Sequence, residues 1–322
     1  MRKKSFSIII RCFNEEEHIG RLLSGILEQT VQPEEIIIVD SGSTDATLSI
    51  ASRFPVRILS ILKENFSFGR SLNIGCRKAR SEILVIASAH VYPIYKNWIE
   101  LLLAPFQNEH VGLVYGKQRA EDVSRFSEQR VFQKWFPDFS VNEQKHPFCN
   151  NANVAVRKDL WEKFNYDEEL TGLEDLDFAK KITQAGYNIS YQSQAVIVHI
   201  HNQSYRQIFG RYYREAVALK KIYPAEKFGR REFIRLLLTN IFSDIIEATK
   251  HPRFMHNLVG VIRFRFMQFW GTYRGFNDGF IKSSVIKGRF YYPAEKEHSV
   301  EGITNIEEQE INYSEILRKP KD

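Results

Sequence analysis

The chain has little cysteine and no apolar stretch long enough to cross a membrane. Its 322 residues include three cysteines, Cys12, Cys76 and Cys149, and no CxxC pair. This argues against a disulfide framework and a structural zinc site, and is typical of a reducing cytosol. No run of about 18 apolar residues occurs, so we expect no membrane span. The short apolar run after MRKK lacks a cleavage site, so we expect no secretory signal.

Nucleotide-binding glycine motifs are absent too. Neither GxGxxG nor GxxxxGK[ST] occurs, so the dinucleotide-binding and P-loop classes have no support. Charge, by contrast, is abundant and unevenly distributed: residues 206–290 hold 17 Lys and Arg against 6 Asp and Glu, and residues 291–322 hold 4 against 8. We therefore expect a catalytic domain at 1–205, a basic amphipathic helical region at 206–290 and an acidic, flexible tail at 291–322.

Continuous Ile and Val runs alternate with helical spacing in the first half. SIIIR at 7–11, IIIVD at 36–40 and EILVIAS at 82–88 are typical of buried strands, and residues 15–30 carry apolar side chains at helical spacing. This order predicts an α/β fold with a mostly parallel sheet covered by helices on both faces. Late strands are expected at 187–192 and 195–201, followed by helices from 205 onward.

Polar residues stand where the first strands end. In open α/β sheets, ligands bind beyond the carboxyl ends of the strands. Asp40 lies at one such end, where its carboxylate can accept hydrogen bonds from a nucleobase or a ribose, and Phe13, after another strand, can stack on the base. For a lone DSGS the simpler interpretation, a turn and helix cap, would be preferred; FNEE after the neighbouring strand favours a site.

These blocks carry a resemblance to a known family. SIIIRCFNEEEHIGRLLSGILEQT, followed by IIIVDSGSTDAT, FSFGRSLNIG and LEDLDF, resembles the inverting family 2 glycosyltransferases of the GT-A fold, over roughly residues 5–202. DSGSTD and SAHxxP are most similar to rhamnosyltransferase-like members that assemble surface polysaccharide or O-antigen. The resemblance implies a Rossmann-like nucleotide-binding half, a UDP-, dTDP- or GDP-linked sugar donor, and a saccharide or polyprenyl-linked acceptor.

The same resemblance implies which residues contact the donor. They lie in the first three of these blocks and at the end of the EILVIAS run: Arg11, Phe13, Glu15, Asp40, Ser41, Arg70, Asn73, Ser88 and His90. Arg70 would neutralise part of the diphosphate, although a solvated helix arginine is an equally good interpretation from residue type alone.

The metal-binding pair of the family is altered in this chain. Where the family has Asp-x-Asp, this sequence has Ser88-Ala89-His90. Imidazole binds Mn²⁺ or similar ions but suits Mg²⁺ poorly. By analogy with the related polypeptide N-acetylgalactosaminyltransferases, His90 with His199 or His201 would form a divalent-cation site. The alternative is metal-independent binding of the diphosphate by His90 with Arg and Lys.

The LEDLDF block resembles the acidic motif near the acceptor. It implies that Asp175 is the base that deprotonates the attacking hydroxyl, with Glu174 and Asp177 orienting the acceptor, the base or the metal. Acidic residues at a helix start also interact favourably with the helix dipole, and this interaction alone would explain the presence of one or two of the three. Asn150-Asn151-Ala152-Asn153 stands where the family has a loop lining the donor sugar and acceptor.

The basic C-terminal region allows three interpretations. It would form a plain helical cap, lie on an anionic membrane surface, or bind RNA; no RNA-binding signature supports the last, so we expect no nucleic-acid partner. We favour a cytoplasmic enzyme that is peripheral on the inner face of the plasma membrane. The altered Asp pair keeps a degenerate, donor-binding or scaffolding homologue open; a nucleotidyltransferase is disfavoured because FNEEEH replaces the Gly- and basic-rich loop it needs.

Overall fold

One mixed sheet organises the catalytic part of the chain. The computed structural model describes residues 4–121, 124–250, 254–278 and 309–316. Within them, eight strands form a sheet in the order β3-β2-β1-β4-β7-β6-β8-β5. The strands are β1 Phe6–Cys12, β2 Glu35–Asp40, β3 Arg57–Ser60, β4 Ile83–Ser88, β5 Val91–Pro93, β6 Val111–Ala120, β7 Asn153–Arg157 and β8 Asn188–His199.

Strand register brings the predicted polar residues to one edge. β3, β2, β1 and β4 run parallel, with Cys12 opposite Asp40 and Arg11 opposite Ser88. The next strand, β7, runs antiparallel to β4 and begins with Asn153 opposite Ala87. The carboxyl ends of β1, β2 and β4 and the start of β7 therefore meet at the same edge.

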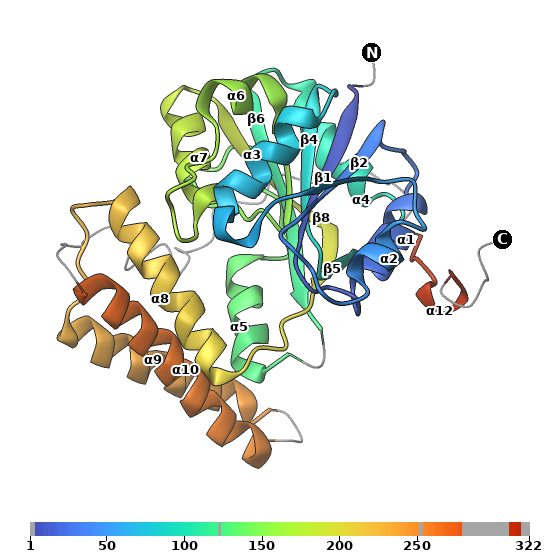
Figure 1. The fold of residues 1–322 in the computed structure, drawn as a ribbon. Helices are drawn as coiled ribbons and strands as arrows, with labels where there is room; N and C mark the ends of the chain where they lie inside the picture. The colour runs from blue at the N-terminus through green and yellow to red at the C-terminus, as the bar shows by residue number, and fades with distance from the viewer. Residues whose placement is uncertain (1–3, 122–123, 251–253, 279–308, 317–322) are drawn as a thin grey trace.

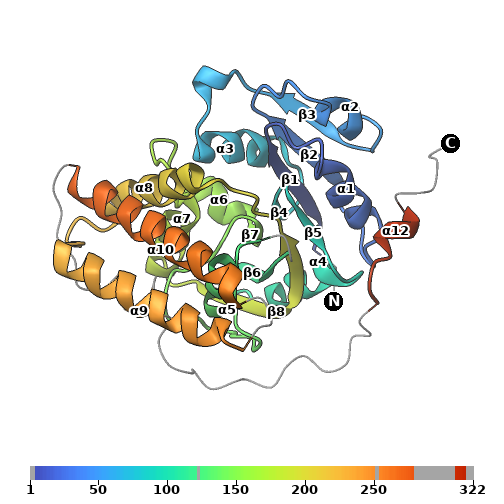
Figure 2. The ribbon, with the colours of Figure 1, turned by 90° about the horizontal axis from the view of Figure 1, so that it is seen from below.

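Helices cover both faces of this sheet (Figures 1 and 2). Because successive side chains of a strand point to opposite faces, Ile8 and Ile10 of β1 pack with α1 and α4, whereas Ile9 packs with α3, α6 and α7. The helices of the catalytic part are α1 Ile19–Leu27, α2 Thr47–Ala51, α3 Phe68–Lys78, α4 Trp98–Leu103, α5 Phe126–Trp135, α6 Lys158–Phe164 and α7 Glu174–Gln184, with short 3-10 turns at Lys63–Asn65 and Ala104–Gln107.

The predicted α/β fold is confirmed, with one correction among the late strands. The two strands expected at 187–192 and 195–201 are a single strand, β8, which pairs with β6 across an irregularity between Gly116 and Gln118. His201 therefore lies beyond the end of the strand rather than on it. The polar Ser193 and Gln194 between the two apolar runs resemble a strand end in sequence, but pairing with β6 carries the strand through them.

Three helices follow the sheet and form the rest of the described chain as far as Asp278. They are α8 Tyr205–Ile222, α9 Arg230–Ala248 and α10 Phe254–Asn277. Leu219, Phe228, Leu236, Phe269 and Phe276 pack between them, together with Leu170 and Leu176 of the catalytic part. In both ribbon views α10 lies between α8 and α9, and α9 is on the outside (Figures 1 and 2). Among the described residues, no helix has both the length and the apolar character to cross a bilayer.

A short stretch of the acidic C-terminal region is described. Most of 291–322 lies outside the described residues, but residues 309–316 pack on the catalytic part and include α12 Tyr313–Ile316. The hydroxyl of Tyr313 donates to the carbonyl of Pro93 at 2.6 Å, and Ile311 N–H donates to the carbonyl of Ile94 at 2.9 Å. Ile311 and Tyr313 let this stretch pack on the catalytic part, although its net charge is acidic.

Candidate active site

A pocket opens between the sheet and the helices α8 and α10. Asp175 and Leu176 of α7 form one wall, His199 and His201 another, and aromatic side chains of α5 lie between them. Gln268 of α10 closes the far side. The lining residues are Gln118, Glu128, Val131, Phe132, Trp135, Phe136, Phe148, Cys149, Asn150, Leu173, Asp175, Leu176, His199, His201, Arg211, Tyr212, Glu215, Ala216, Leu219 and Gln268. Mostly apolar walls with a few converging polar groups are typical of a small-molecule site.

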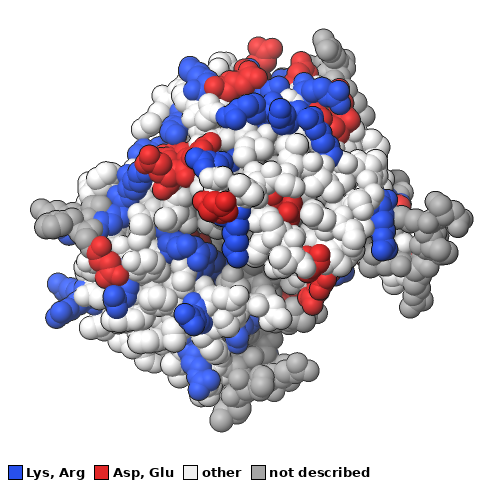
Figure 3. All heavy atoms as spheres, in the orientation of Figure 1, with Lys and Arg blue, Asp and Glu red and all other residues white. Residues whose placement is uncertain are grey.

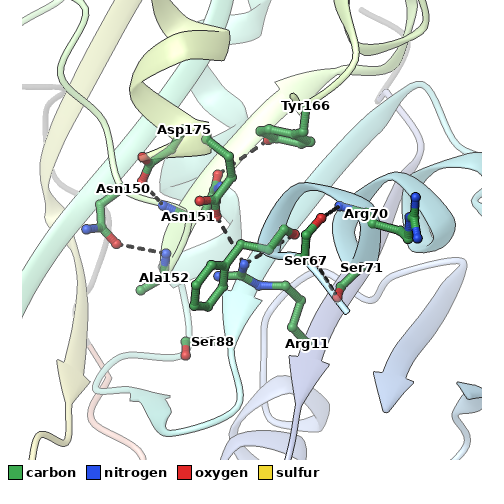
Figure 4. Close-up of polar contacts among 12 residues, drawn as sticks. Arg11, Ser67, Arg70, Ser71, Ser88, Asn150, Asn151, Ala152, Tyr166 and Asp175 are labelled. Atoms are coloured by element: carbon green, nitrogen blue, oxygen red, sulfur yellow. Dashed lines mark hydrogen bonds and ion pairs between the residues drawn. The ribbon is translucent and has the colours of Figure 1, made fainter. Parts of the chain in front are cut away.

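Two acidic residues at the start of α7 are buried side by side. Glu174 is 5 % exposed and Asp175 is 9 % exposed. Glu174 accepts from Arg11 Nη1 at 3.0 Å and from the side chain of Asn151 at 3.2 Å, and Asp175 accepts from the backbone N–H of Asn151 at 3.1 Å. Figure 4 shows how Arg11 and Asn151 reach this pair from β1 and from the loop before β7. The donor edge and the acidic block are thus tied together.

Backbone strain marks the turn before this pair. Leu173 caps α7 with φ 56° and ψ 26°, in the left-handed region. A bulky residue held there costs on the order of 1–3 kcal/mol and persists only where its surroundings demand it. Such strain gathers at functional sites, and here it sets the direction in which Glu174 and Asp175 leave the loop.

Burial changes the acidity of Asp175. Its loss of solvation, together with the neighbouring charge of Glu174, raises the pKa of Asp175 from 3.8 to about 7, against the opposing hydrogen bonds from Asn151 and Leu176. A carboxyl with a pKa near neutrality can take up a proton at physiological pH, which is what a general base requires. The structure therefore gives the predicted base suitable chemistry.

The third acidic residue of the block has different surroundings. Asp177 is half-buried and pairs with Lys181 at 2.7 Å, one helical turn further along. It is not among the residues that line the pocket. Of the three predicted residues, the structure brings Glu174 and Asp175 together, and it uses Asp177 within α7.

Asp40 holds its own turn. It is 2 % exposed, and its carboxylate accepts from the backbone N–H groups of Gly42 at 3.0 Å and Ser43 at 3.1 Å. Gly42 has φ 89°, which a glycine adopts without strain. Ser41 is also buried and donates to the carbonyl of Cys12 at 3.1 Å. These contacts are those of the simpler interpretation, a turn, and they shape the donor edge from within.

The residues after β1 offer freer groups. Phe13 is 39 % exposed, and Lys63 Nζ lies 5.1 Å from the centre of its ring. Asn14 has φ 54°, and its side chain accepts from the N–H of Thr44, which ties this loop to the turn after β2. An exposed aromatic face beside a cation is suited to a nucleobase and its phosphates.

Arg70 and Asn73 of α3 are both engaged within the protein. Arg70 donates to Glu168 at 2.8 Å and points away from Asp175 (Figure 4). Asn73 is buried: its amide donates to Tyr166 and Glu168 and accepts from Trp161 and Tyr166. All its hydrogen-bonding positions are filled, so Asn73 fastens α3 to the segment before α7 and has no group left for a donor.

The three predicted histidines meet beside the pocket. His199 Nε2 and His201 Nε2 are 3.0 Å apart, and the ring centres of His90 and His199 are 5.0 Å apart. Ligand atoms of all three lie within 4.8 Å of one another. Ser88 Oγ lies 3.2 Å from His90 Nε2. Residues more than a hundred positions apart in sequence thus form one cluster.

The second ring nitrogen of each histidine faces an oxygen. Nδ1 of His90, His199 and His201 lies 2.7 Å from an oxygen of Glu15, Gln118 and Glu128, respectively. Oxygen partners at Nδ1 fix the rings of His90 and His199 so that Nε2 is presented to a metal. Nδ1 of His201 also lies 2.9 Å from Nη1 of Arg211. Burial, with added repulsion from neighbouring positive groups, lowers the pKa of His199 well below its ordinary value, and burial lowers that of His201 to about 4. Neutral imidazoles are what a metal needs, so these residues fit a cation.

Sequence reasoning missed the residues that support the histidines. Glu128 of α5 is 2 % exposed and accepts from Arg211 of α8 at 2.7 Å. Although burial opposes its charge, Arg211 and His201 lower the pKa of Glu128 to about 2. Neither residue stands in a motif, and both lie on helices that read as ordinary polar ones. The burial of Glu128 depends on the packing of α5 beside β8, which the sequence does not show.

Comparison with known proteins adds the family. The sequence model described as Glycosyl transferase family 2 matches residues 7–164. The O-antigen chain rhamnosyltransferase WbaN of Salmonella anatum is 30% identical over 227 residues, which are 66% of this chain and 71% of that protein. The O-antigen chain rhamnosyltransferase RfbN of Salmonella typhimurium is 28% identical over 225 residues, again 66% and 71% of the two chains. These comparisons give no support to the scaffolding or nucleotidyltransferase alternatives.

Solved structures confirm the fold. The mannosyltransferase PcManGT of Pyrobaculum calidifontis, in complex with GDP-Man and Mn²⁺, aligns with TM-score 0.60 at 19% identity, covering 86% of this chain and 88% of that one. TarS 1–349 of S. aureus, in complex with UDP, aligns with TM-score 0.51 at 17% identity, covering 84% and 90%. The predicted GT-A fold is confirmed, and at these identities the likeness is one of fold.

Proposed function

The chain belongs to glycosyl transferase family 2 and is a glycosyltransferase, and on this basis we propose that it transfers a sugar with inversion from a nucleoside diphosphate to a saccharide hydroxyl in surface polysaccharide or O-antigen assembly. The observation that carries the proposal is the buried carboxyl of Asp175 in the pocket, with its pKa near 7. The two rhamnosyltransferases make rhamnose the first donor sugar to test, with UDP, dTDP and GDP as candidate nucleotides.

Transfer in this proposal is one in-line displacement. The acceptor oxygen attacks the anomeric carbon and gives its proton to the Asp175 carboxylate, while the bond from that carbon to the nucleoside diphosphate breaks on the opposite face. One displacement inverts the anomeric centre and needs a base but no protein nucleophile. Glu174, fixed by Arg11 and Asn151, keeps negative charge next to Asp175 and so favours proton uptake there.

We propose that the donor binds along the carboxyl edge of β1, β2 and β4. The exposed ring of Phe13 and the nearby Lys63 support a place for the nucleobase. Arg11 at the end of β1 and His90 after β4 bring basic groups to the same edge. Asp40 and Ser41 shape the turn that closes it.

A divalent cation is part of this proposal. His90, His199 and His201 would hold it, with Glu15, Gln118 and Glu128 orienting the rings. When bound, a cation supplies positive charge for the departing diphosphate. Three imidazoles favour Mn²⁺ or a similar ion over Mg²⁺. Titration of the protein with Mn²⁺, followed by the spin-resonance signal of the free ion, checks this: His90→Ala should weaken binding at least about tenfold, and equal binding by the variant would contradict the site.

The acceptor is proposed to enter from the aromatic side of the pocket. Phe132, Trp135, Phe136 and Phe148 offer flat apolar surfaces for a sugar ring or for the first part of a polyprenyl chain. The basic helices beside the pocket support a location on the inner, cytoplasmic face of the plasma membrane, where a lipid-linked acceptor resides. Vesicle binding, described below, tests that location.

Substitution of the base tests the proposed reaction. Purified protein is given UDP-, dTDP- and GDP-linked sugars, and release of nucleoside diphosphate is measured. Asp175→Asn should lower turnover by roughly 10²–10⁴-fold, because a general base contributes that much, while the nucleotide sugar still raises the unfolding temperature. Asp177→Asn, two residues along and paired with Lys181, is the comparison. Equal turnover in wild type and Asp175→Asn would overturn the assignment of the base.

A further inference from the structure

Helix α9 exposes four large apolar side chains and buries two polar ones. Ile234, Leu238, Phe242 and Ile246 are 54, 47, 62 and 64 % exposed. Their spacing of four residues places them on one side of the helix. Side chains of this size and apolar character usually lie in a protein core, yet these four face outward.

The inward side of α9 is correspondingly polar. Asp244 is fully buried and receives two hydrogen bonds from Arg265 of α10, at 2.7 and 3.0 Å. Asn240 is buried one turn earlier and donates to the carbonyl of Leu236. Asp244 and the buried Leu236 fix the inner side of α9 against its neighbours, so the apolar side chains on its outer side are left for something other than this chain's own core.

Helix α10 extends the same surface. Val259, Ile262 and Phe266 are 54, 45 and 42 % exposed. The ring centre of Phe266 lies 6.4 Å from that of Phe233, which neighbours Ile234, so the two helices meet on this side. We call this surface the apolar face; it consists of Ile234, Leu238, Phe242, Ile246, Val259, Ile262 and Phe266. Clusters of this kind mark contact sites for proteins or membranes.

Basic residues surround the apolar face. Exposed cations lie on α9, on α10 and just after the end of α9. They are Arg230, Arg231, Arg235, Lys250, Arg263 and Arg274. Two nearby acids are paired with these cations: Glu247 with Lys250 at 3.0 Å, and Asp278, just after α10, with Arg274 at 3.1 Å. In the lower left of Figure 3, where Figure 1 draws the three helices, the charged atoms are mainly those of Lys and Arg.

This combination selects among possible occupants. A second copy of the chain would bring the same positive charge to a shared two-fold interface and be repelled. An anionic lipid surface offers phosphates to the arginines and acyl chains to Ile, Leu and Phe, which is how interfacial amphipathic helices bind. Charge complementarity therefore favours the lipid.

We propose that the apolar face of α9 and α10 docks flat on an anionic phospholipid surface. The inference rests on the proposed function for its purpose, because Gln268 of α10 lines the pocket while Phe266, two residues before it, is on the docking face. One helix thus joins the membrane to the acceptor pocket. A lipid-linked acceptor would reach Asp175 along the inner side of α10.

Vesicle binding by the full chain tests this surface. The protein is sedimented with vesicles of phosphatidylcholine alone and of phosphatidylcholine mixed with phosphatidylglycerol, at low and high salt. Wild type should bind the anionic vesicles and be released by salt. Phe242→Gln with Ile246→Gln should weaken binding about tenfold or more, and Arg231→Gln with Arg235→Gln should do so while removing the preference for phosphatidylglycerol.

A matched control substitutes an exposed leucine that lies outside the apolar face. Leu62 is 63 % exposed on the catalytic part, and Leu62→Gln should bind vesicles like wild type. Circular dichroism confirms folding of each variant, and release of nucleoside diphosphate without lipid reports the reaction separately from docking. Vesicle binding unchanged in the Phe242 and Ile246 variant overturns the proposal, as does a concentration-dependent dimer that this variant abolishes.

Discussion

The sheet region and the helical region distribute polar residues in opposite ways. In β1, β2 and β4 the interior is almost wholly Ile, Val and Leu, and polar side chains stand at strand ends, where Arg11, Asp40 and Ser88 meet. In α9 and α10 the interior holds the ion pair of Asp244 and Arg265 beside buried Leu and Phe, and the surface also carries large Ile and Phe side chains. The same physical rule, that apolar groups leave water, gives both patterns.

The difference supports the proposal that α9 and α10 face a lipid surface while the sheet region faces water. Where water surrounds a domain, apolar residues lie inside and polar residues at the boundary mark chemistry. Where another apolar phase is available, outward Ile and Phe are satisfied there, and the helix can be fixed by a buried ion pair. The pocket, with Asp175 from one region and Gln268 from the other, lies where the two patterns meet.

Loss of the buried ion pair should have the largest effect on the helical region. Asp244→Ala leaves Arg265, 2 % exposed, without its partner, and a buried unpaired charge costs about 3–5 kcal/mol. Urea unfolding measures the loss in free energy. Because the penalty comes from the remaining charge, Asp244→Leu with Arg265→Met should recover most of it. A loss below about 1 kcal/mol in Asp244→Ala would mean that the pair does not hold α9.

The two regions also differ in how far sequence predicted them. SIIIR and IIIVD predicted β1 and β2 almost to the residue, because a strand buried on both faces reads as a continuous apolar run. The helical pattern expected from residue 205 onward located α9 as a helix. It did not show that Ile234 and Leu238 face outward, because helical periodicity identifies the apolar side of a helix but not what that side packs against.

The candidate site shows the same limit. Asp175, Glu174 and the three histidines came from the family resemblance, and the structure brings each set together. Glu128 and Arg211, which hold His201, came from no motif, since their pairing depends on α5 and α8 packing beside β8. Asn73 was expected at the donor, and its full set of internal bonds became visible only with Trp161 and Tyr166 in place.

Two leucines on α9 sharpen the comparison within one helix. Leu236 is fully buried, and Leu238 is 47 % exposed on the apolar face. Leu236→Ala should cost about 2–5 kcal/mol of unfolding free energy, as core truncations do, whereas Leu238→Ala should stay within about 0.5 kcal/mol in the absence of lipid. Thermal unfolding of both variants side by side checks this. If Leu238→Ala cost as much as Leu236→Ala, the apolar face would belong to the folded core.

The smallest expected effect on turnover is that of pH, at the carboxyl where the regions meet. The pKa of Asp175 is raised from 3.8 to about 7 by burial and by Glu174, so the folded state favours its protonated form. The stability that this group contributes is therefore complete below about pH 4 and is lost as the pH rises through 7. Asp175→Asn, which cannot titrate, should gain stability relative to wild type over that interval.

Turnover should change in the opposite sense: between pH 8 and pH 6 the ionised fraction of Asp175, and with it the rate, should fall about tenfold. A rate that is flat over this range, together with a constant stability difference between the two proteins, would show that Asp175 is ionised throughout and that the boundary between the two regions is more solvated than its burial indicates.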